Sequence, residues 1–257
     1  MQVASLGSGS KGNATLVRGG DSLLLVDCGF SMAEARLRLA CHGVCAENLD
    51  GILITHEHGD HIRGVGALAR RFNIPVYASA GTLAAVCDGR HGLHGCVTEV
   101  LEPGKAVTLA DINVMPVAVP HDAREPCQFV FEYQRRRLGV LTDLGSLTVS
   151  VKENFDDCDA LLLECNYDAD LLRDGPYPVS LKRRVGGGLG HLSNDQAARL
   201  LAQINSDRLQ YLLLCHLSQQ NNTPARALAA VHAVLPNGHN RVSVATQDEG
   251  FSWLTLQ

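Results

Sequence analysis

Three histidines and one aspartate are concentrated in the segment Thr55–His61, which reads THEHGDH. The segment follows a short apolar run, Gly51–Thr55, and a loop at the end of a strand is a place where side chains can converge on one point. Imidazole nitrogens and a carboxylate are suitable ligands for Zn, Mn or Fe. Four such groups crowd a single ion that must keep an open position, so the spacing favours two ions sharing the loop. The alternative is a solvated, histidine-rich turn.

With this segment the chain resembles the metallo-β-lactamase-fold hydrolases, whose hallmark is the motif H-x-H-x-D-H. Three later motifs of that family match in the same order, and they end in or contain His121, Asp143 and His216. The resemblance implies a water that ionises near neutral pH and acts as the nucleophile, with Asp60 available to orient it. It also implies two metal ions with Asp143 bridging them, the first held by His56, His58 and His121, the second by Asp60, His61 and His216.

The three later ligands each have a simpler interpretation. His91 and His94 compete with His121, although both lie in a turn-like region and we expect them at the surface. Asp143 could be a turn residue before Gly145, and His216 could be a histidine of the core. The position of His121, Asp143 and His216 at the ends of apolar runs favours the metal site.

Two further residues indicate which bond is broken. Glu164 follows the apolar run Ala160–Leu163, and His191 lies just before a helix start at Ser193. These motifs are similar to a pair found in the tRNA 3′-processing endonucleases, and cleavage of a P–O bond needs such a general acid. The resemblance makes His191 the acid and Glu164 the residue that orients it. The alternative is that both are merely structural groups at element ends.

The segments Ser5–Asn13 and Cys215–Pro224 resemble the YycJ-like (WalJ) branch of the same superfamily, which is associated with 5′-to-3′ exonuclease activity on DNA. The Gly/Ser-rich loop in the first segment offers backbone N–H groups and a lysine to a phosphate. A basic run followed by glycines, residues 182–190, could form a mobile lid over a nucleic-acid backbone, or simply a solvated face. The substrate-binding candidates are therefore Ser8, Ser10, Lys11, Asn13, Lys182, Arg183 and Arg184. Arg135–Arg137 is more typical of an exposed hairpin.

The rest of the chain must position these groups. Alternating or continuous apolar runs predict strands at Val3–Leu6, Thr15–Val17, Leu23–Asp27, Gly51–Thr55, Pro75–Ala78, Val97–Leu101, Ala106–Leu109, Ile112–Val119, Gln128–Tyr133, Leu138–Thr142, Ala160–Glu164, Leu209–Cys215, Val242–Ala245 and Ser252–Leu256. Helical spacing and caps predict helices at Ser31–Leu39, His61–Phe72, Thr82–Val86, Asp195–Ile204 and Pro224–Val234. This order suits two mixed β-sheets packed face to face with helices on the outer faces, the α/β four-layer αββα sandwich that the resemblance implies.

Composition sets the remaining limits. The chain has 257 residues, a net charge of -5 and nine cysteines without a Cys-x-x-Cys pair. We expect one domain over residues 1–257 with no inserted nucleic-acid-binding domain, because the stretch between Asp143 and His216 is short. The cysteine pattern favours reduced thiols in a cytoplasmic protein. No apolar run is long enough to cross a membrane, and the oligomeric state is not readable.

The main hypothesis is a dinuclear, Zn- or Mn-dependent phosphodiesterase, with Fe also compatible, that acts as a nuclease on DNA. A second hypothesis keeps the metals but replaces nucleic acid by a small molecule such as a cyclic phosphodiester, a lactone or a thioester. The modest acidity of the chain agrees with that alternative. A third is a metal-binding protein without catalytic activity. The ligand types do not separate DNA from RNA, or exonucleolytic from endonucleolytic cleavage.

Overall fold

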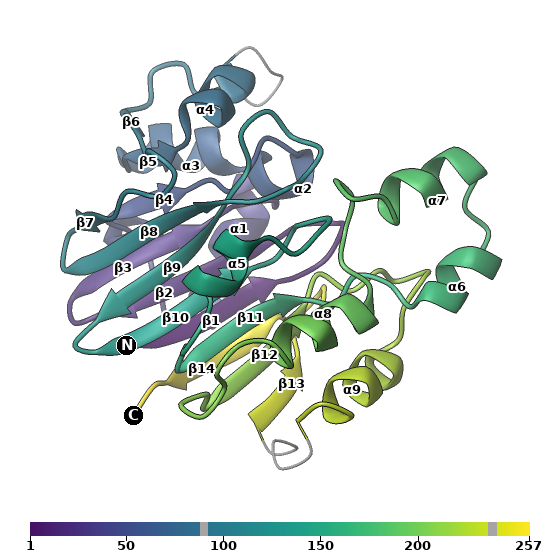
Figure 1. Cartoon of the computed structure of the whole chain (residues 1–257). Helices are drawn as coiled ribbons and strands as arrows, with labels where there is room; N and C mark the ends of the chain where they lie inside the picture. Colours follow the sequence, from purple (N-terminus) through teal and green to yellow (C-terminus); the bar gives the residue numbers. More distant parts are fainter. Residues whose placement is uncertain (88–91, 236–240) are drawn as a thin grey trace.

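The computed structural model describes residues 1–87, 92–235 and 241–257. Within these ranges the strands form two sheets of seven, packed face to face (Figure 1). The first sheet has the order β14-β1-β2-β3-β4-β5-β6. Its strands are β1 (Gln2–Gly7), β2 (Ala14–Gly19), β3 (Ser22–Val26), β4 (Gly51–Leu53), β5 (Val76–Ala78), β6 (Thr98–Val100) and β14 (Phe251–Thr255).

The second sheet has the order β13-β12-β11-β10-β9-β8-β7. Its strands are β7 (Val107–Leu109), β8 (Ile112–Ala118), β9 (Cys127–Tyr133), β10 (Arg136–Leu141), β11 (Ala160–Glu164), β12 (Tyr211–Cys215) and β13 (Val242–Val244). Strands β10 to β13 run parallel, and β8 runs in the same direction because β9 is antiparallel to both β8 and β10. The carboxyl ends of β8, β10, β11 and β12 therefore meet at one edge of this sheet.

The core follows the two-residue period of the strands. In β3, Leu24 and Val26 face the other sheet, whereas Leu23 and Leu25 belong to a separate cluster beneath the outer helices. In β12, Leu213 and Cys215 point between the sheets and Leu212 and Leu214 point outward. Each sheet is thus apolar on both faces, which agrees with the predicted sandwich. Burying one such leucine contributes roughly 1.5–3 kcal/mol.

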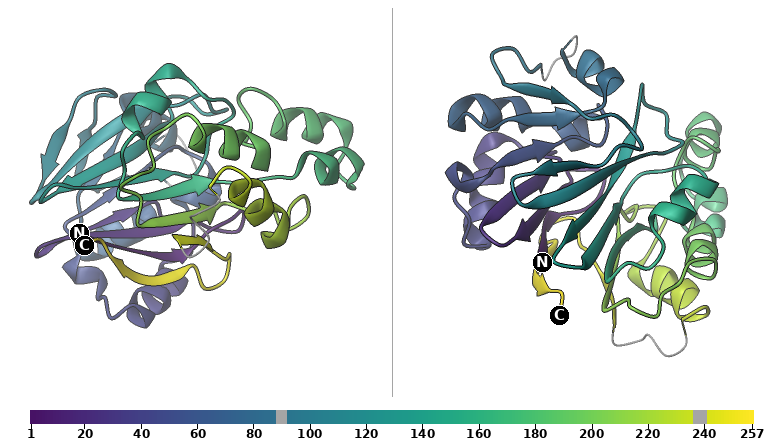
Figure 2. Two further views of the ribbon diagram at one scale, coloured as in Figure 1. Left: turned by 60° about the horizontal axis from the view of Figure 1, so that its bottom comes forward. Right: turned by 60° about the vertical axis from the view of Figure 1, so that its left-hand side comes forward.

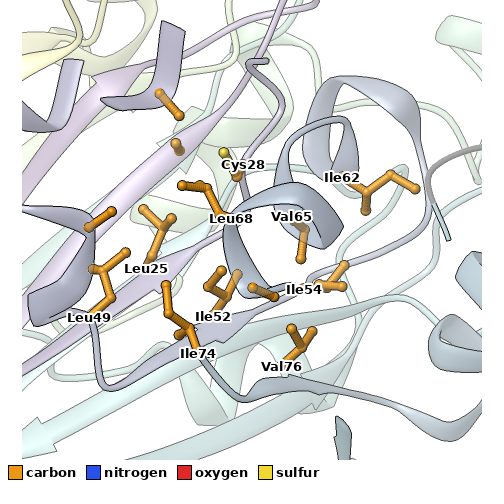
Figure 3. Close-up of a cluster of buried hydrophobic side chains, with 14 of the residues drawn as sticks. Leu25, Cys28, Leu49, Ile52, Ile54, Ile62, Val65, Leu68, Ile74 and Val76 are labelled. Atoms are coloured by element: carbon orange, nitrogen blue, oxygen red, sulfur yellow. The ribbon is translucent and has the colours of Figure 1, made fainter. Parts of the chain in front are cut away.

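Helices cover the outer face of each sheet. Figure 3 shows the cluster under α3, in which Leu68 and Val65 pack on Leu25, Ile52 and Val76 of the first sheet. The helices on this side are α1 (Met32–Cys41), α2 (Gly59–Ile62), α3 (Val65–Phe72) and α4 (Ala80–Cys87), with a short 3₁₀ turn at Ala46–Asn48. The second sheet is covered by α5 (Val149–Asn154), α8 (Asn194–Leu201) and α9 (Pro224–His232). Two more helices, α6 (Ala169–Asp174) and α7 (Val179–Val185), extend from the side of the sandwich (Figures 1 and 2).

Local signals explain the helix ends. The capping box expected at Ser193 is present, with Ser193 accepting from the N–H of Gln196 and the Gln196 side chain accepting from the N–H of Ser193. Helix α9 begins with Thr223 as N-cap and Pro224 in its first turn. Such caps each contribute about 1 kcal/mol, so they fix where the chain enters the helices after β11 and β12.

One prediction about helices was wrong, and α7 was not predicted. The continuous helix expected over His61–Phe72 is divided into α2 and α3, because Gly64 donates to Cys28 O and a Cβ on Gly64 would lie 2.2 Å from Phe30 O. The basic run Lys182–Arg184, for which a mobile lid and a solvated face were the alternatives, forms the last turn of α7. No residue of α7 is buried, so the helix has no apolar stripe that a sequence could reveal. No helix in the described parts of the chain is both long and apolar enough to cross a membrane.

Candidate metal centre and its acid pair

The histidine-rich loop is held between β4 and α2 by backbone contacts from the N-terminal strands. Cys28 N donates to His61 O at 2.7 Å, and Asn13 N donates to Asp60 O at 2.8 Å. The chain passes so close at this point that a Cβ on Gly29 would lie 1.7 Å from Asp60 O. Only glycine fits there, and the loop is consequently fixed before any ligand binds.

Three histidine side chains form the first group of candidate ligands, which we call site A: His56, His58 and His121. His58 Nδ1 lies 2.9 Å from His56 Nε2 and 3.3 Å from His121 Nε2. His56 and His121 are buried, and His58 is partly exposed. Burial and the neighbouring histidines lower the pKa of His56 well below its usual value. Neutral imidazoles with converging nitrogens suit a divalent cation.

A second group, site B, consists of Asp60, His61 and His216. Asp60 Oδ2 lies 3.7 Å from His61 Nε2 and 3.6 Å from His216 Nε2. Asp143 lies between the groups, with Oδ2 3.3 Å from His61 Nε2 and Oδ1 2.9 Å from His216 Nδ1. The predicted ligands from the loop and from the ends of three distant strands are therefore within reach of one another.

Unpaired atoms show that these residues fit metal ions. Neither carboxylate oxygen of Asp143 nor Nε2 of His216 makes a hydrogen bond of good geometry among the described residues, although all three atoms are buried. Their contacts at 2.9 to 3.6 Å join them to other candidate ligands. Buried polar atoms without partners are rare and destabilising unless an ion or water binds them. Asp143 is 1 % exposed, so bulk water does not solvate its charge. A cation placed among these atoms would satisfy all of them.

The charges of site B are strongly coupled. Burial disfavours charge on His61, but Asp143, Asp27 and Asp60 outweigh burial and raise the pKa of His61 to about 9. Burial would raise the pKa of Asp60, but His61 and His216 lower it to about 2. Burial likewise opposes charge on Asp143, and His216 and His61 nevertheless hold its pKa well below the usual value. The carboxylates of the cluster thus carry negative charge, which protonated histidines neutralise when no other cation is bound.

His61 and His56 are oriented by two residues that sequence reasoning missed, Asp27 and Thr55. Asp27 Oδ2 lies 2.8 Å from His61 Nδ1, and the same carboxylate accepts from the N–H and the hydroxyl of Thr55 at 2.8 Å each. Thr55 Oγ1 in turn lies 2.9 Å from His56 Nδ1. These contacts occupy the Nδ1 atoms and turn Nε2 of both rings toward the other candidate ligands. The available signal was an acidic residue at the end of an apolar strand, directly before Cys28 and Gly29.

The predicted acid pair lies beside the metal ligands. Glu164 is fully buried at the end of β11, and its Oε1 contacts His191 Nδ1 at 2.7 Å and His216 Nδ1 at 3.2 Å. Its Oε2 accepts from the N–H groups of Leu144 and Leu192. The centroid of the His191 ring lies 5.2 Å from the ring centroid of His121 and 5.2 Å from that of His216. Glu164 therefore fixes His191 at the rim of the cluster.

The N-terminal substrate candidates divide into two kinds. Ser8 and Asn13 are buried: Ser8 Oγ accepts from His216 N at 2.8 Å, and Asn13 Nδ2 lies 3.1 Å from His61 Nε2. Ser8 therefore supports the backbone of one candidate ligand, whereas Asn13 lies against the ring nitrogen of another that faces site B. Binding of a phosphate by these two residues stays a prediction. Ser10 and Lys11 are exposed on the loop. Their contact with a substrate stays a prediction.

The cations of α7 also have different surroundings. Lys182 Nζ donates to Arg173 O, and Arg183 is exposed. Arg184 Nε donates to Asp122 Oδ2 at 2.5 Å, which brings the end of α7 next to His121. Of the histidines that competed with His121, His94 is exposed and outside the cluster, and His91 lies outside the described residues.

Comparisons with known proteins agree with this geometry. Residues 23–216 match the family model described as a β-lactamase superfamily domain. The chain is 36% identical over 238 residues to exodeoxyribonuclease YycJ of Bacillus anthracis, covering 91% of this chain and 89% of that protein. It is also 36% identical to exodeoxyribonuclease WalJ of Streptococcus pneumoniae strain D39, covering 84% of this chain and 81% of that one.

A solved structure gives the same fold independently. The metallo-β-lactamase fold protein YhfI from Bacillus subtilis superposes with a TM-score of 0.75 at 20% identity, over 98% of each chain. Both seven-stranded sheets therefore have counterparts in an established architecture. The expected sandwich and the expected superfamily are confirmed, and the chain belongs to the β-lactamase superfamily of metal-dependent hydrolases, in the family of YycJ and WalJ.

Proposed function

We propose that the chain is a two-metal phosphodiesterase that degrades DNA from its 5′ end. The two relatives named exodeoxyribonucleases are similar over most of their own length, which supports a nuclease and DNA as its substrate. We assign one divalent ion, Zn or Mn, to each of sites A and B, with Asp143 between them. A cytoplasmic location fits the nine cysteines, all of which are free thiols.

The contact between Glu164 and His191 is the observation that favours phosphodiesters over other substrates. An alkoxide is a poor leaving group, so cleavage of the P–O bond needs a proton donor close to the departing oxygen. Glu164 accepts the Nδ1 proton of His191, and this leaves Nε2–H of the protonated ring to donate. The side chain of His191 is 20 % exposed, so a bound substrate can reach it.

The proposed reaction is the hydrolysis of one P–O bond. Divalent ions bound at sites A and B would act as Lewis acids on the phosphate and lower the pKa of water. The water oxygen forms a new bond to phosphorus while the bond to the leaving sugar oxygen breaks. His191 gives its Nε2 proton to that oxygen, and the buried carboxylate of Glu164 stabilises the charge on the ring before transfer. We assign to Asp60, which is partly exposed in site B, the role of accepting a proton from the attacking water.

Polar and basic groups on the loop after β1 and on α7 are candidates to bind the rest of the DNA. Ser10 and Lys11 lie on the loop after β1, and Lys182 and Arg183 lie on α7. Phosphate contacts of this kind position a nucleic acid without reading its sequence. We expect them to raise affinity for a polymer substrate compared with a small diester.

The test is a comparison of linear and circular duplex DNA, with 5′-phosphate or 5′-hydroxyl ends, in Zn²⁺ or Mn²⁺. We expect release of mononucleotides from linear DNA with a 5′-phosphate, and no cleavage of the circular form. Cleavage of circles would instead indicate an endonuclease, and cleavage of RNA alone would overturn the assignment to DNA. Hydrolysis of small diesters, lactones or thioesters without any nucleic acid cleavage would favour the small-molecule alternative.

A further inference from the structure

Two of the three site A histidines are held by groups outside the sheets, at the end of α7 and just after it. His121 Nδ1 lies 2.8 Å from Gly190 O, which occupies the nitrogen that does not face the cluster. The segment that follows α7 is closely packed, since a Cβ on Gly190 would lie 2.2 Å from both Arg184 O and Val185 O. The position of His121 thus depends on the path of the chain after α7.

His58 is linked to the same helix through Asp122. His58 directs Nδ1 to the cluster. Asp122 Oδ1 lies 3.7 Å from the other nitrogen of His58, Nε2, and 3.5 Å from Nε2 of His121, so this carboxylate pairs with both of these site A histidines. The Asp122 carboxylate is itself held in this orientation by Arg184, whose Nε donates to Asp122 Oδ2 at 2.5 Å. A carboxylate next to the non-ligating nitrogen of a histidine orients the ring and increases its basicity.

Site B is supported differently. His61 is oriented by Asp27 at the end of β3, and His216 by Glu164 at the end of β11. Both carboxylates are buried in the sandwich, whereas Asp122 is 28 % exposed and Arg184 is 60 % exposed. The two sites therefore differ in what holds their ligands: the core for site B and, in part, a surface helix for site A.

We propose that Arg184, acting through Asp122, is a positioning residue that sets the metal affinity of site A and not that of site B. The inference rests on the proposed two-metal centre. Removal of the guanidinium releases Asp122 from its fixed orientation, and His58 loses its partner. Helix α7 is then a structural part of the metal centre, so any change that displaces its last turn loosens one ion selectively.

Titration of metal-free protein with Zn²⁺ against a chromophoric chelator tests this directly. The wild type should show two binding steps, and His58→Ala and His216→Ala identify which step belongs to site A and which to site B. We expect Arg184→Ala to weaken the site A step about 10- to 100-fold and to leave the site B step unchanged. Asp122→Asn, which keeps the shape of the side chain, should have the same effect. Arg183→Ala is the matched control, because Arg183 has the same charge in the same turn but no polar partner among the described residues.

Each result has one interpretation. An unchanged site A step in both Arg184→Ala and Asp122→Asn overturns the inference, while the two steps of the wild type still support the metal pair. Equal weakening of both steps overturns it too, since that indicates a general loss of structure. Fewer than two ions in the wild type would contradict the two-metal centre itself. If Arg184→Ala does not fold, Asp122→Asn alone decides.

Discussion

The Glu164 carboxylate lies 2.7 Å from Nδ1 of His191, although α6 and α7 separate the two residues along the chain. The same oxygen also lies 3.2 Å from His216 Nδ1. One buried carboxylate thus aligns the proposed acid with a proposed metal ligand. A carboxylate of the core thereby links the proton donor to a ligand of site B.

His191→Ala should reduce the rate of DNA cleavage about 10²- to 10⁴-fold, the usual contribution of a general acid. Hydrolysis of bis(p-nitrophenyl) phosphate should change little, because nitrophenolate leaves without a proton. Both rates are measured at saturating metal. His94→Ala, a change to an exposed histidine outside the cluster, should affect neither rate. Equal losses on both substrates would show that His191 acts on the metal centre or on folding.

Ser8→Ala and Ser10→Ala separate support of a ligand from contact with substrate. Ser8 Oγ is the acceptor for the N–H of His216, so its removal leaves a buried donor unpaired at a cost of about 1–3 kcal/mol. We expect a lower free energy of unfolding for Ser8→Ala in urea. Ser10 is exposed, and Ser10→Ala should keep the wild-type stability and raise KM for DNA. A stability loss in Ser10→Ala but not in Ser8→Ala would contradict this division.

Asp27→Asn should weaken metal binding about 10- to 100-fold, because the amide cannot accept from His61 Nδ1 and from both groups of Thr55 as the carboxylate does. Isothermal titration of the metal-free variant with Zn²⁺ measures the loss. Asp21→Asn, at an exposed position of the turn before β3, is the control and should bind metal normally. Wild-type affinity in Asp27→Asn would show that Thr55 alone orients the two histidines.

Removal of metal should lower the midpoint of thermal unfolding and abolish activity. Ligands that bind only the folded state stabilise it by RT ln(1 + [L]/Kd), about 2.7 kcal/mol per site at one hundred times Kd. Scanning calorimetry with EDTA, and then with Zn²⁺ or Mn²⁺ added back, measures the shift. Asp143→Ala removes the carboxylate shared by the two sites and should show a much smaller shift. An unchanged midpoint in wild type after complete chelation would argue against the metal centre.

The buried thiols should resist alkylation over a wide pH range. Burial raises the pKa of Cys28, Cys127 and Cys158 to about 12. The reactive thiolate is therefore a negligible fraction at pH 8 and remains small at pH 10. Mass spectrometry after iodoacetamide treatment of native protein should find modification at the exposed Cys41, Cys45 and Cys87. Modification of Cys28 before unfolding would contradict this.

The strands and the ligand set were predictable from the sequence because both leave a periodic or spaced signal. The continuous apolar runs of β3 and β11 each indicate their elements, and the ligands follow strand ends in order. Helix α7 left no such signal, since none of its residues is buried. Asp27 was missed, and Ser8 was assigned to substrate binding, for a related reason. Each side chain contacts a residue that is far away in the chain, and only the packing of the sheets brings the two together.

Residues 246–255 constrain the order in which the site can form. Ser8 donates its N–H to Thr246 O, and Gln247 bonds Gly12 O and Lys11 N on the same loop. Strand β14 pairs with β1, which is made first. The loop that supports His216 is therefore complete only when residues 246–255 have folded against it. A partly folded chain in which this segment is not yet docked has the histidine-rich loop but lacks these contacts to the loop after β1.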